Sequence, residues 1–283
     1  MTKILEAKPF LDIHTPKLKA QIETLSIKPS LAVILVGQHP SSLLYVKNKI
    51  SYLESVGAES TLYQFSESIE ATEFTSKVNE ITNNPKHQGV LIQLPVPSQL
   101  QKINMRTLVP PHLDVDGFHP QNISRLYFNS DDFYLTPCTP SGIISLLNFY
   151  HIELSGKNIA VLGRSHIVGK PLSLILENKN ATVTLCHSRT QNIKEITKTA
   201  DIIISAMGKP HYIDSSFLSL NKNQILIDVG ISKLDGKTVG DMNFSDCLGH
   251  CSAITPVPGG VGPMTIYSLA QNLFYATINN KII

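Results

Sequence analysis

Apolar runs of strand length alternate along the chain with segments whose apolar residues recur every three to four positions. A run of about four to eight apolar residues, rich in β-branched side chains and bounded by turn residues, is typical of a buried strand. The runs predicted to be strands are 31–36, 60–65, 89–94, 158–162, 182–186, 201–205 and 224–229. The segments predicted to be helices are 41–56, 72–82, 139–150, 171–176, 193–199 and 264–279. This alternation predicts an α/β fold in which helices cover both faces of parallel sheets.

The length of 283 residues exceeds what one compact core usually serves, so we expect two domains. An N-terminal α/β domain is placed at 1–138 and is completed by a C-terminal helix within 264–283. A Rossmann-like domain with a parallel sheet is placed at 139–263. We expect a cleft between the two domains.

The stretch 158–171 combines a strand, a glycine-containing loop and the start of a helix. Gly163 ends the strand, and Gly169 precedes a proline at a position that the first turn of a helix tolerates. Such a helix start offers unpaired backbone N–H groups to an anion, and glycine lets a pyrophosphate approach closely. The spacing differs from the usual dinucleotide fingerprint, so an ordinary strand–loop–helix fits this stretch equally well.

The residues after the next strand indicate which dinucleotide would bind. An NAD-binding unit places a carboxylate there for the ribose hydroxyls, but this chain has His187, Ser188, Arg189 and Thr190. Hydroxyl and guanidinium groups suit a phosphate instead. Together with Arg164 and Ser165, which are next to Gly163, they favour NADP over NAD.

Composition excludes several classes of partner. The net charge is only +2, charged residues make up 16% of the chain and tryptophan is absent, so we expect no nucleic-acid partner. The N-terminus has no apolar core of signal-peptide length and no stretch approaches a membrane span, so we expect a cytoplasmic protein without a membrane partner. Four scattered cysteines predict reduced thiols, and the cluster Cys247–Cys251 with His250 lacks further ligands, so no metal is expected.

Three places in the first half of the chain could carry chemistry. Tyr45 and Lys49 lie one helical turn apart, Gln93 stands at the carboxyl end of a strand, and Asp114 and Asp116 flank one valine in a long loop. Each has an ordinary alternative: a solvated helix face, a hydrogen bond at the sheet edge, and a turn.

Six motifs in order give the chain a resemblance that these alternatives do not explain. They are Tyr45-Val-Lys-Asn-Lys49, Gly89-Val-Leu-Ile-Gln-Leu-Pro95, Asp114-Val-Asp-Gly-Phe-His-Pro120, Pro137-Cys-Thr-Pro140, Gly163-Arg-Ser165 with Val168-Gly-Lys-Pro171, and Pro256-Val-Pro-Gly-Gly-Val-Gly-Pro-Met-Thr265. Over nearly its whole length the chain resembles the bifunctional methylenetetrahydrofolate dehydrogenase/methenyltetrahydrofolate cyclohydrolase family.

The resemblance implies NADP-dependent oxidation of 5,10-methylenetetrahydrofolate and hydrolysis of the methenyl product to 10-formyltetrahydrofolate. It implies that the first domain binds the tetrahydrofolate derivative and is catalytic, that the second binds NADP, and that the folate lies in the cleft. It also implies a role in one-carbon metabolism and purine biosynthesis, and a homodimer.

The resemblance also assigns site residues. Lys49 is implied as the central catalytic group, Tyr45 packs against the folate, Gln93 hydrogen-bonds to Lys49, and Asp116 binds the pterin. The implied cofactor residues are Gly163, Arg164, Ser165, Ser188 and Ile231. The implied folate loop residues are Pro258, Gly259 and Gly260.

Three positions depart from the family pattern. Leu113 stands where lysine is usual, Ser124 where glycine is usual, and Ser232 where asparagine is usual. None of them coincides with the four implied catalytic positions, so activity is still expected.

Two other hypotheses about function compete with this one. A shikimate-dehydrogenase-like NADP oxidoreductase shares the two-domain plan but would leave the Pro-Gly-Gly loop unexplained. A nucleotide-sensing module without catalysis would bind NADP but not folate.

Overall fold

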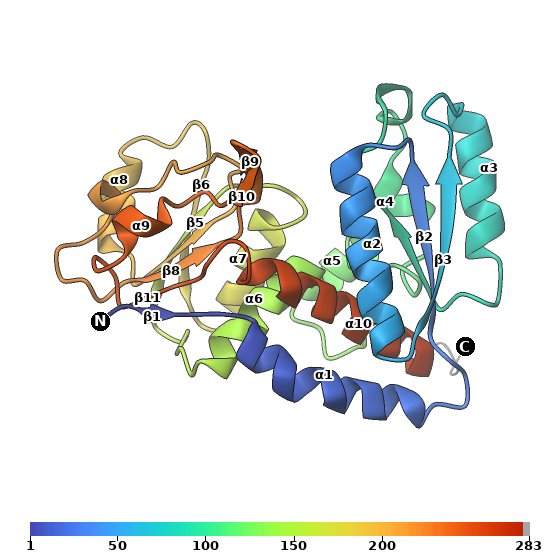
Figure 1. The fold of residues 1–283 in the computed structure, drawn as a ribbon, viewed down its shortest axis with the longest axis horizontal. Coiled ribbons are helices and arrows are strands. Elements are labelled where there is room, and N and C mark those ends of the chain that lie inside the picture. Colours follow the sequence, from blue (N-terminus) through green and yellow to red (C-terminus); the bar gives the residue numbers. More distant parts are fainter. Residues whose placement is uncertain (280–283) are drawn as a thin grey trace. The chain divides into compact units, whose positions relative to one another are not determined.

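The computed structural model describes residues 1–279 and divides the chain into two compact units, which Figure 1 shows. The three-stranded unit comprises residues 13–138 and the described residues from 266 onward. The six-stranded unit comprises residues 1–12 and 139–265. The unit boundaries fall inside two long helices, α1 (Lys8–Glu23) and α10 (Val261–Asn279).

The three-stranded unit contains a parallel sheet with the order β3-β2-β4. Its strands are β2 (Ser30–Val36), β3 (Glu59–Phe65) and β4 (Gly89–Ile92). Its helices are α2 (Pro40–Ser55), α3 (Ala71–Thr82), α4 (Met105–Leu108) and α5 (Pro120–Tyr127), with a 3₁₀ turn at Ser98–Leu100. Every residue of β2 and β4 is buried, as expected for strands covered on both faces. One apolar face of α3, formed by Phe74, Val78 and Ile81, packs into the same core.

The six-stranded unit contains a parallel sheet with the order β1-β11-β8-β7-β5-β6. Its strands are β1 (Lys3–Ile4), β5 (Asn158–Leu162), β6 (Thr182–Cys186), β7 (Ile202–Ser205), β8 (Ile225–Asp228) and β11 (Ala253–Ile254). An antiparallel hairpin is formed by β9 (Ser232–Leu234) and β10 (Lys237–Val239). The helices are α6 (Cys138–Phe149), α7 (Gly169–Asn178), α8 (Ile193–Thr199) and α9 (Phe244–Cys247), with a 3₁₀ turn at Ser215–Phe217.

The predicted α/β fold class is confirmed, and each predicted strand and helix matches an element to within a few residues. The predicted C-terminal helix begins earlier, at Val261, and its predicted last residues, 280–283, lie outside the described part of the chain. Among the residues that the structure describes, no helix has the length and apolar character needed to cross a membrane.

The N-terminal segment differs from the sequence-based domain assignment. Residues 1–12 belong to the six-stranded unit, because β1 pairs in parallel with β11. Helix α1 follows, although its sequence contains Pro16, which disfavours a helix interior. Burial of Phe10, Leu18 and Ile22 on one side of this helix outweighs that cost.

Candidate active site

The lysine and the glutamine predicted to carry catalysis are joined by a hydrogen bond in the three-stranded unit. Lys49 lies on α2, and its Nζ donates to Oε1 of Gln93 at 3.1 Å. Gln93 directly follows β4, and its backbone N–H donates to the carbonyl of Ile34 at 2.8 Å. Its Nε2 donates to the carbonyl of Leu94 at 2.7 Å, so the amide is oriented with its oxygen toward the ammonium. The sheet therefore fixes the acceptor, and α2 brings the lysine to it.

Tyr45 lies one turn before Lys49 on α2, with 37% of its surface exposed. Partial burial raises the pKa of its hydroxyl, so this phenol stays protonated at neutral pH. An exposed tyrosine ring offers a flat surface to an aromatic ligand.

The loop that carries Asp114 and Asp116 is held by buried polar contacts. Oδ2 of Asp114 accepts from the backbone N–H of His119 at 2.6 Å and from Nδ2 of Asn122 at 3.1 Å. Burial raises the pKa of Asp114 to about 6, although these hydrogen bonds oppose the shift. Asp114 therefore shapes the loop from inside, which leaves Asp116 as the carboxylate available to a ligand.

Asn272 and Cys138, neither of which was predicted as a site residue, hold the same loop. The carbonyl of Val115 accepts from Nδ2 of Asn272 at 2.8 Å and from the thiol of Cys138 at 3.1 Å. Asn272 comes from α10, and its Nδ2 also donates to the carbonyl of Thr136 at 2.8 Å. The periodicity of α10 predicts a buried position at 272, but it does not reveal the partners, which are more than a hundred residues away.

Asp116 lies near the positive charge of Lys49 and the negative charge of Asp114. Burial raises its pKa, and the positive charge of Lys49 opposes that shift. The same lysine and both aspartates act on the thiol of Cys138, whose pKa burial raises well above its usual value. The charge of Lys49 thus lies close enough to Asp116 and Cys138 to favour the ionised forms of both groups.

A pocket beside β4 is lined in part by Asp114 and Asp116. Its lining combines apolar side chains with two carboxylates and one guanidinium: Val90, Leu91, Ile92, Leu94, Met105, Arg106, Val109, Asp114, Asp116 and Phe118. Arg106, on α4, was not predicted from the sequence. The chemistry of this lining suits a ligand with an apolar body and a donor-rich edge.

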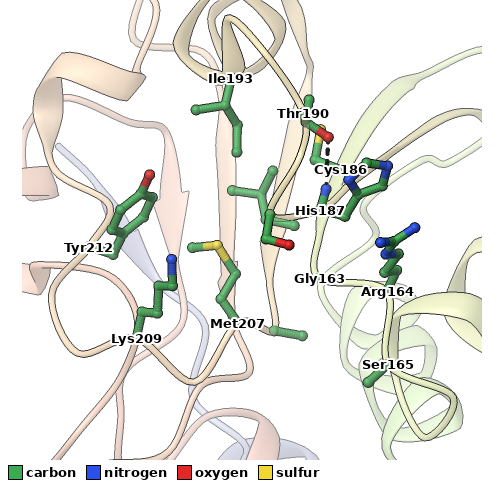
Figure 2. A pocket seen from close by; sticks show the side chains of 13 residues that line it. Gly163, Arg164, Ser165, Cys186, His187, Thr190, Ile193, Met207, Lys209 and Tyr212 are labelled. Carbon is green, nitrogen blue, oxygen red and sulfur yellow. Dashed lines mark hydrogen bonds between the residues drawn. The ribbon is translucent and has the colours of Figure 1, made fainter.

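A second pocket, of about 340 Å³, lies at the carboxyl ends of strands in the six-stranded unit (Figure 2). It is lined by Leu162, Gly163, Arg164, Ser165, Cys186, His187, Ser188, Thr190, Ile193, Ala206, Met207, Lys209 and Tyr212. This lining contains arginine, lysine and hydroxyl groups but neither aspartate nor glutamate. Ligands of parallel α/β sheets bind at this edge, and this donor set suits an anion.

The glycines of the loop after β5 are required by close backbone contact. Gly163 has a φ of +115°, and a Cβ at Gly169 would collide with the carbonyl oxygen of Gly163. Oγ of Ser165 accepts from the backbone N–H groups of Val168 at 3.1 Å and Gly169 at 3.4 Å. Ser165 thus organises the first turn of α7 while it lines the pocket.

The loop after β6 is fixed by its own hydrogen bonds. Oγ1 of Thr190 accepts from the backbone N–H of His187 at 2.8 Å, the contact drawn in Figure 2. Nδ1 of His187 accepts from the backbone N–H of Arg189 at 3.1 Å. This arrangement brings Ser188 to the pocket wall, whereas Arg189 lies on the exposed surface.

Lys209 and Tyr212 form one wall of this pocket. Neither residue was predicted from the sequence to belong to the site. Nζ of Lys209 lies 4.9 Å from the centre of the Tyr212 ring, within the range of a cation–π contact. In Figure 2 these two side chains lie across the pocket from Arg164. The turn Ala206-Met207-Gly208, which follows β7, leads into this wall.

The remaining predicted residues lie on loops of the six-stranded unit. Ile231 follows β8 and is 43% exposed. Pro258 is exposed in the loop before α10, and the carbonyl of Gly259 accepts from the backbone N–H of Ala7 at 2.8 Å. Gly260 is buried, and a Cβ there would press on the carbonyl oxygen of Pro256 at 2.6 Å. Their roles toward a ligand stay predictions.

The departures from the family pattern are accommodated locally. Leu113 is buried in the core of the three-stranded unit. Ser124 is exposed on α5, and Ser232 begins β9.

The fold and the two pockets define a two-domain α/β enzyme that uses a dinucleotide. The chain belongs to the tetrahydrofolate dehydrogenase/cyclohydrolase family. Residues 5–116 match the catalytic domain of that family, and residues 137–281 match its NAD(P)-binding domain.

Similarity to individual members extends over nearly the whole chain. This chain is 41% identical over 276 residues to the bifunctional protein FolD of Halalkalibacterium halodurans. The matched region covers 96% of this chain and 98% of that protein. The crystal structure of the bifunctional enzyme FolD from Campylobacter jejuni is 37% identical with a TM-score of 0.95, covering 99% of this chain and 100% of that chain. The Trypanosoma brucei enzyme, complexed with NADP and an inhibitor, is 27% identical with a TM-score of 0.90, covering 98% of each chain.

Shikimate dehydrogenases share only the fold with this chain. Shikimate 5-dehydrogenase from Listeria monocytogenes is 13% identical with a TM-score of 0.53, a likeness that concerns the fold alone.

Proposed function

We propose that this chain oxidises 5,10-methylenetetrahydrofolate with NADP and hydrolyses the resulting 5,10-methenyltetrahydrofolate to 10-formyltetrahydrofolate. The observation that carries the proposal is the hydrogen bond from Lys49 to Gln93 beside Asp116, in a chain that belongs to the dehydrogenase/cyclohydrolase family.

The oxidation requires positioning rather than an acid or a base. When bound, the oxidised nicotinamide accepts a hydride from the methylene carbon. The carbon that remains lies between two nitrogen atoms whose lone pairs stabilise the cation. The chain's residues contribute by holding the folate and excluding other orientations, which is the work we assign to Tyr45 and Asp116.

The hydrolysis requires proton movement, and Lys49 is the residue placed to provide it. Water attacks the methenyl carbon and forms a C–O bond. One proton of that water is released and the other moves to N5 as the bond from carbon to N5 breaks. An amine that exchanges protons at Nζ accelerates such steps by roughly a hundred- to ten-thousandfold. Gln93 orients that amine through its fixed Oε1.

Asp116 is assigned to recognition of the pterin. The aminopyrimidinone edge presents two adjacent N–H donors, and a carboxylate accepts both in a charge-assisted pair. Its half-buried position beside the apolar residues of the pocket strengthens such a contact.

The pocket of the six-stranded unit is assigned to NADP. Arg164, Ser165 and Ser188 supply cationic and hydroxyl groups, and the pocket wall contains no carboxylate that would suit a free ribose 2′-hydroxyl. The relative from Trypanosoma brucei was solved with NADP, which supports this choice. Ile231, Pro258, Gly259 and Gly260 are proposed contacts to the nicotinamide side and the folate.

We also propose a homodimer that forms along β3. Within the described residues, β3 is an edge strand of seven residues that pairs only with β2, and Leu62 on it is 41% exposed. Exposed edges of this length are natural sites of association. Light scattering tests this: Leu62→Lys should lower the measured mass toward 31.1 kDa, and an unchanged mass would contradict the assignment.

A cytoplasmic location is proposed on the four free, buried cysteines, which are typical of a reducing compartment. The product 10-formyltetrahydrofolate is a formyl donor, so we place the enzyme in one-carbon metabolism that supplies purine biosynthesis.

The direct test mixes purified protein with methylenetetrahydrofolate and NADP and follows reduced nicotinamide and the methenyl intermediate by absorbance. We expect reduced nicotinamide without methenyl build-up beyond the rate of spontaneous hydrolysis. Lys49→Met should abolish the hydrolysis and cause the methenyl species to accumulate. Lys47→Met, an exposed change on the same helix, should behave as wild type.

Other outcomes separate the alternatives. Unchanged hydrolysis in Lys49→Met would overturn the role of that residue. Binding of NADP without any folate binding would favour a nucleotide sensor, and oxidation of shikimate would favour the distant fold relative.

A further inference from the structure

A buried carboxylate holds one wall of the dinucleotide pocket. Asp241 is fully buried at the segment 240–242, which follows the β9–β10 hairpin. Its Oδ2 accepts from the backbone N–H of Met207 at 2.6 Å, and its Oδ1 accepts from the backbone N–H of Lys209 at 2.7 Å. Both residues line the pocket. The turn that presents them is therefore tied to a single side chain more than thirty residues away in the sequence.

A second buried carboxylate holds the first one in place. Oδ1 of Asp228, at the end of β8, accepts from the backbone N–H groups of Asp241 at 2.9 Å and Gly230 at 3.0 Å. Its Oδ2 accepts from the backbone N–H of Met242 at 2.8 Å. Asp228 thus fixes the backbone from which Asp241 projects.

The backbone packs closely against the two carboxylates. A Cβ at Gly230 would collide with Oδ1 of Asp241, and a Cβ at Gly240 would collide with Oδ2 of Asp228. The backbone carbonyl of Asp241 also accepts from the N–H of Ile213 at 3.0 Å. The 240–242 segment is consequently held by hydrogen bonds and close contacts on several sides.

We propose that Asp241 is a positioning residue for the dinucleotide: it sets the 206–209 turn so that Met207 and Lys209 form a preorganised wall of the pocket, with Asp228 as its anchor. This inference rests on the proposed function in that the dinucleotide is taken to be NADP. Without the carboxylate, the backbone N–H groups of the turn would be unsatisfied and the wall would no longer match the cofactor before it binds.

The test is Asp241→Asn, because the amide keeps the shape but replaces one acceptor by a donor. Whichever way the amide turns, its NH₂ faces the backbone N–H of either Met207 or Lys209. We expect the KM for NADP to rise at least about tenfold, with kcat of the dehydrogenase changed less than about threefold. Hydrolysis of methenyltetrahydrofolate, assayed without NADP, should keep its wild-type rate.

Two matched variants show whether the effect belongs to the pocket wall. Ser205→Ala removes another donor to the same carboxylate, from Oγ at 2.9 Å, but leaves the bonds to the turn. Asp201→Asn changes an exposed carboxylate that accepts from the backbone N–H of Asn158 at the opposite end of the strands. Both should keep the KM for NADP within about threefold of wild type.

An unchanged KM for NADP in Asp241→Asn would overturn the proposal. Equal loss of both activities would also overturn it, because that result means general destabilisation. Failure of the wild type to process folate would instead refute the proposed function, and the proposal would then be judged by the dissociation constant of NADP.

Hydrogen exchange of the wild type tests the proposal if Asp241→Asn does not fold. The amides of Met207 and Lys209 should be protected in the absence of NADP, since a buried carboxylate accepts both. Rapid exchange of these amides in the free protein would show that Asp241 does not hold the turn.

Discussion

Nζ of Lys49 donates to Oε1 of Gln93 at 3.1 Å, although 44 residues separate them in the sequence. The contact depends on the parallel sheet, because Gln93 follows β4 and Lys49 lies on the helix that follows β2. The contact gives Nζ of Lys49 one fixed hydrogen-bond acceptor, so its other hydrogens point away from Gln93.

Replacing Gln93 should therefore impair the hydrolysis more than the oxidation. In Gln93→Ala the amine loses its fixed acceptor, and we expect the cyclohydrolase kcat to fall about tenfold to a hundredfold, since proton transfer depends on geometry. The dehydrogenase should fall less, because hydride removal needs no acid or base. Both rates are read in the coupled absorbance assay, with Gln101→Ala, an exposed change, as the control. Equal losses in the two activities would contradict the assigned role.

Asn272 should support both stability and folate binding. Asn272→Leu removes the amide donor to the carbonyls of Val115 and Thr136 and leaves Val115 with the weaker thiol donor of Cys138, and losing a hydrogen bond to a buried carbonyl costs about 1–3 kcal/mol. We expect the unfolding free energy to fall by about 2 kcal/mol or more and the KM for folate to rise, because Val115 adjoins Asp116. Urea unfolding and steady-state kinetics measure the two effects.

The control for this change is Asn279→Ala, which removes an exposed contact to the carbonyl of Tyr275 on the same helix. It should leave both quantities near their wild-type values. A similar loss in the two variants would show that α10 is sensitive in general rather than at Asn272.

His87 should make the protein less stable in mild acid. It is 4% exposed, its Nδ1 lies 3.0 Å from Oγ of Ser30, and its Nε2 lies 2.9 Å from the hydroxyl of Tyr63. Burial, assisted by the charge of Lys86, lowers its pKa below 6.5, so the unfolded chain takes up the proton first. Its contribution is therefore fully present above pH 6.5 and is lost as the pH falls through the lowered pKa of the folded state.

The measurement is the unfolding free energy of wild type and His87→Gln between pH 8 and pH 5, values chosen around the usual histidine pKa of about 6.5. The advantage of wild type over the variant should shrink as the pH falls. A constant difference across this range would show that His87 does not titrate with unfolding.

Arg164 should contribute to the preference for NADP. Arg164→Gln removes a cation from the pocket, so the KM for NADP should rise at least about tenfold, while the KM for NAD should change little because NAD lacks the 2′-phosphate. Kinetics with both cofactors measures the ratio. Lys179→Gln, an exposed charge change after α7, serves as the control. An equal rise for both cofactors would mean that Arg164 contacts the shared pyrophosphate instead.

Much of the fold could be predicted because its strands are apolar runs and its helices are periodic. The runs at 31–36 and 202–205 are buried along their whole length, which is the condition under which an apolar run marks a strand. Helix α1 escaped prediction because Pro16 interrupts its pattern, and β1 escaped because two residues are too few to carry one.

The family and the types of residue at the site were determined by the sequence itself. Short motifs such as Tyr45 to Lys49 place chemical groups at fixed spacing on one element, and this local geometry follows from helix and turn periodicity. The absence of a carboxylate after β6 is likewise a local fact.

Only the tertiary structure decided which distant groups meet. Asn272 holds the Asp116 loop, and Asp241 holds the 206–209 turn, through hydrogen bonds to backbone atoms. Backbone N–H and carbonyl groups are the same at every residue, so the sequence carries no mark of which one a side chain will satisfy. That choice is made when the sheets assemble and buried polar groups must find partners.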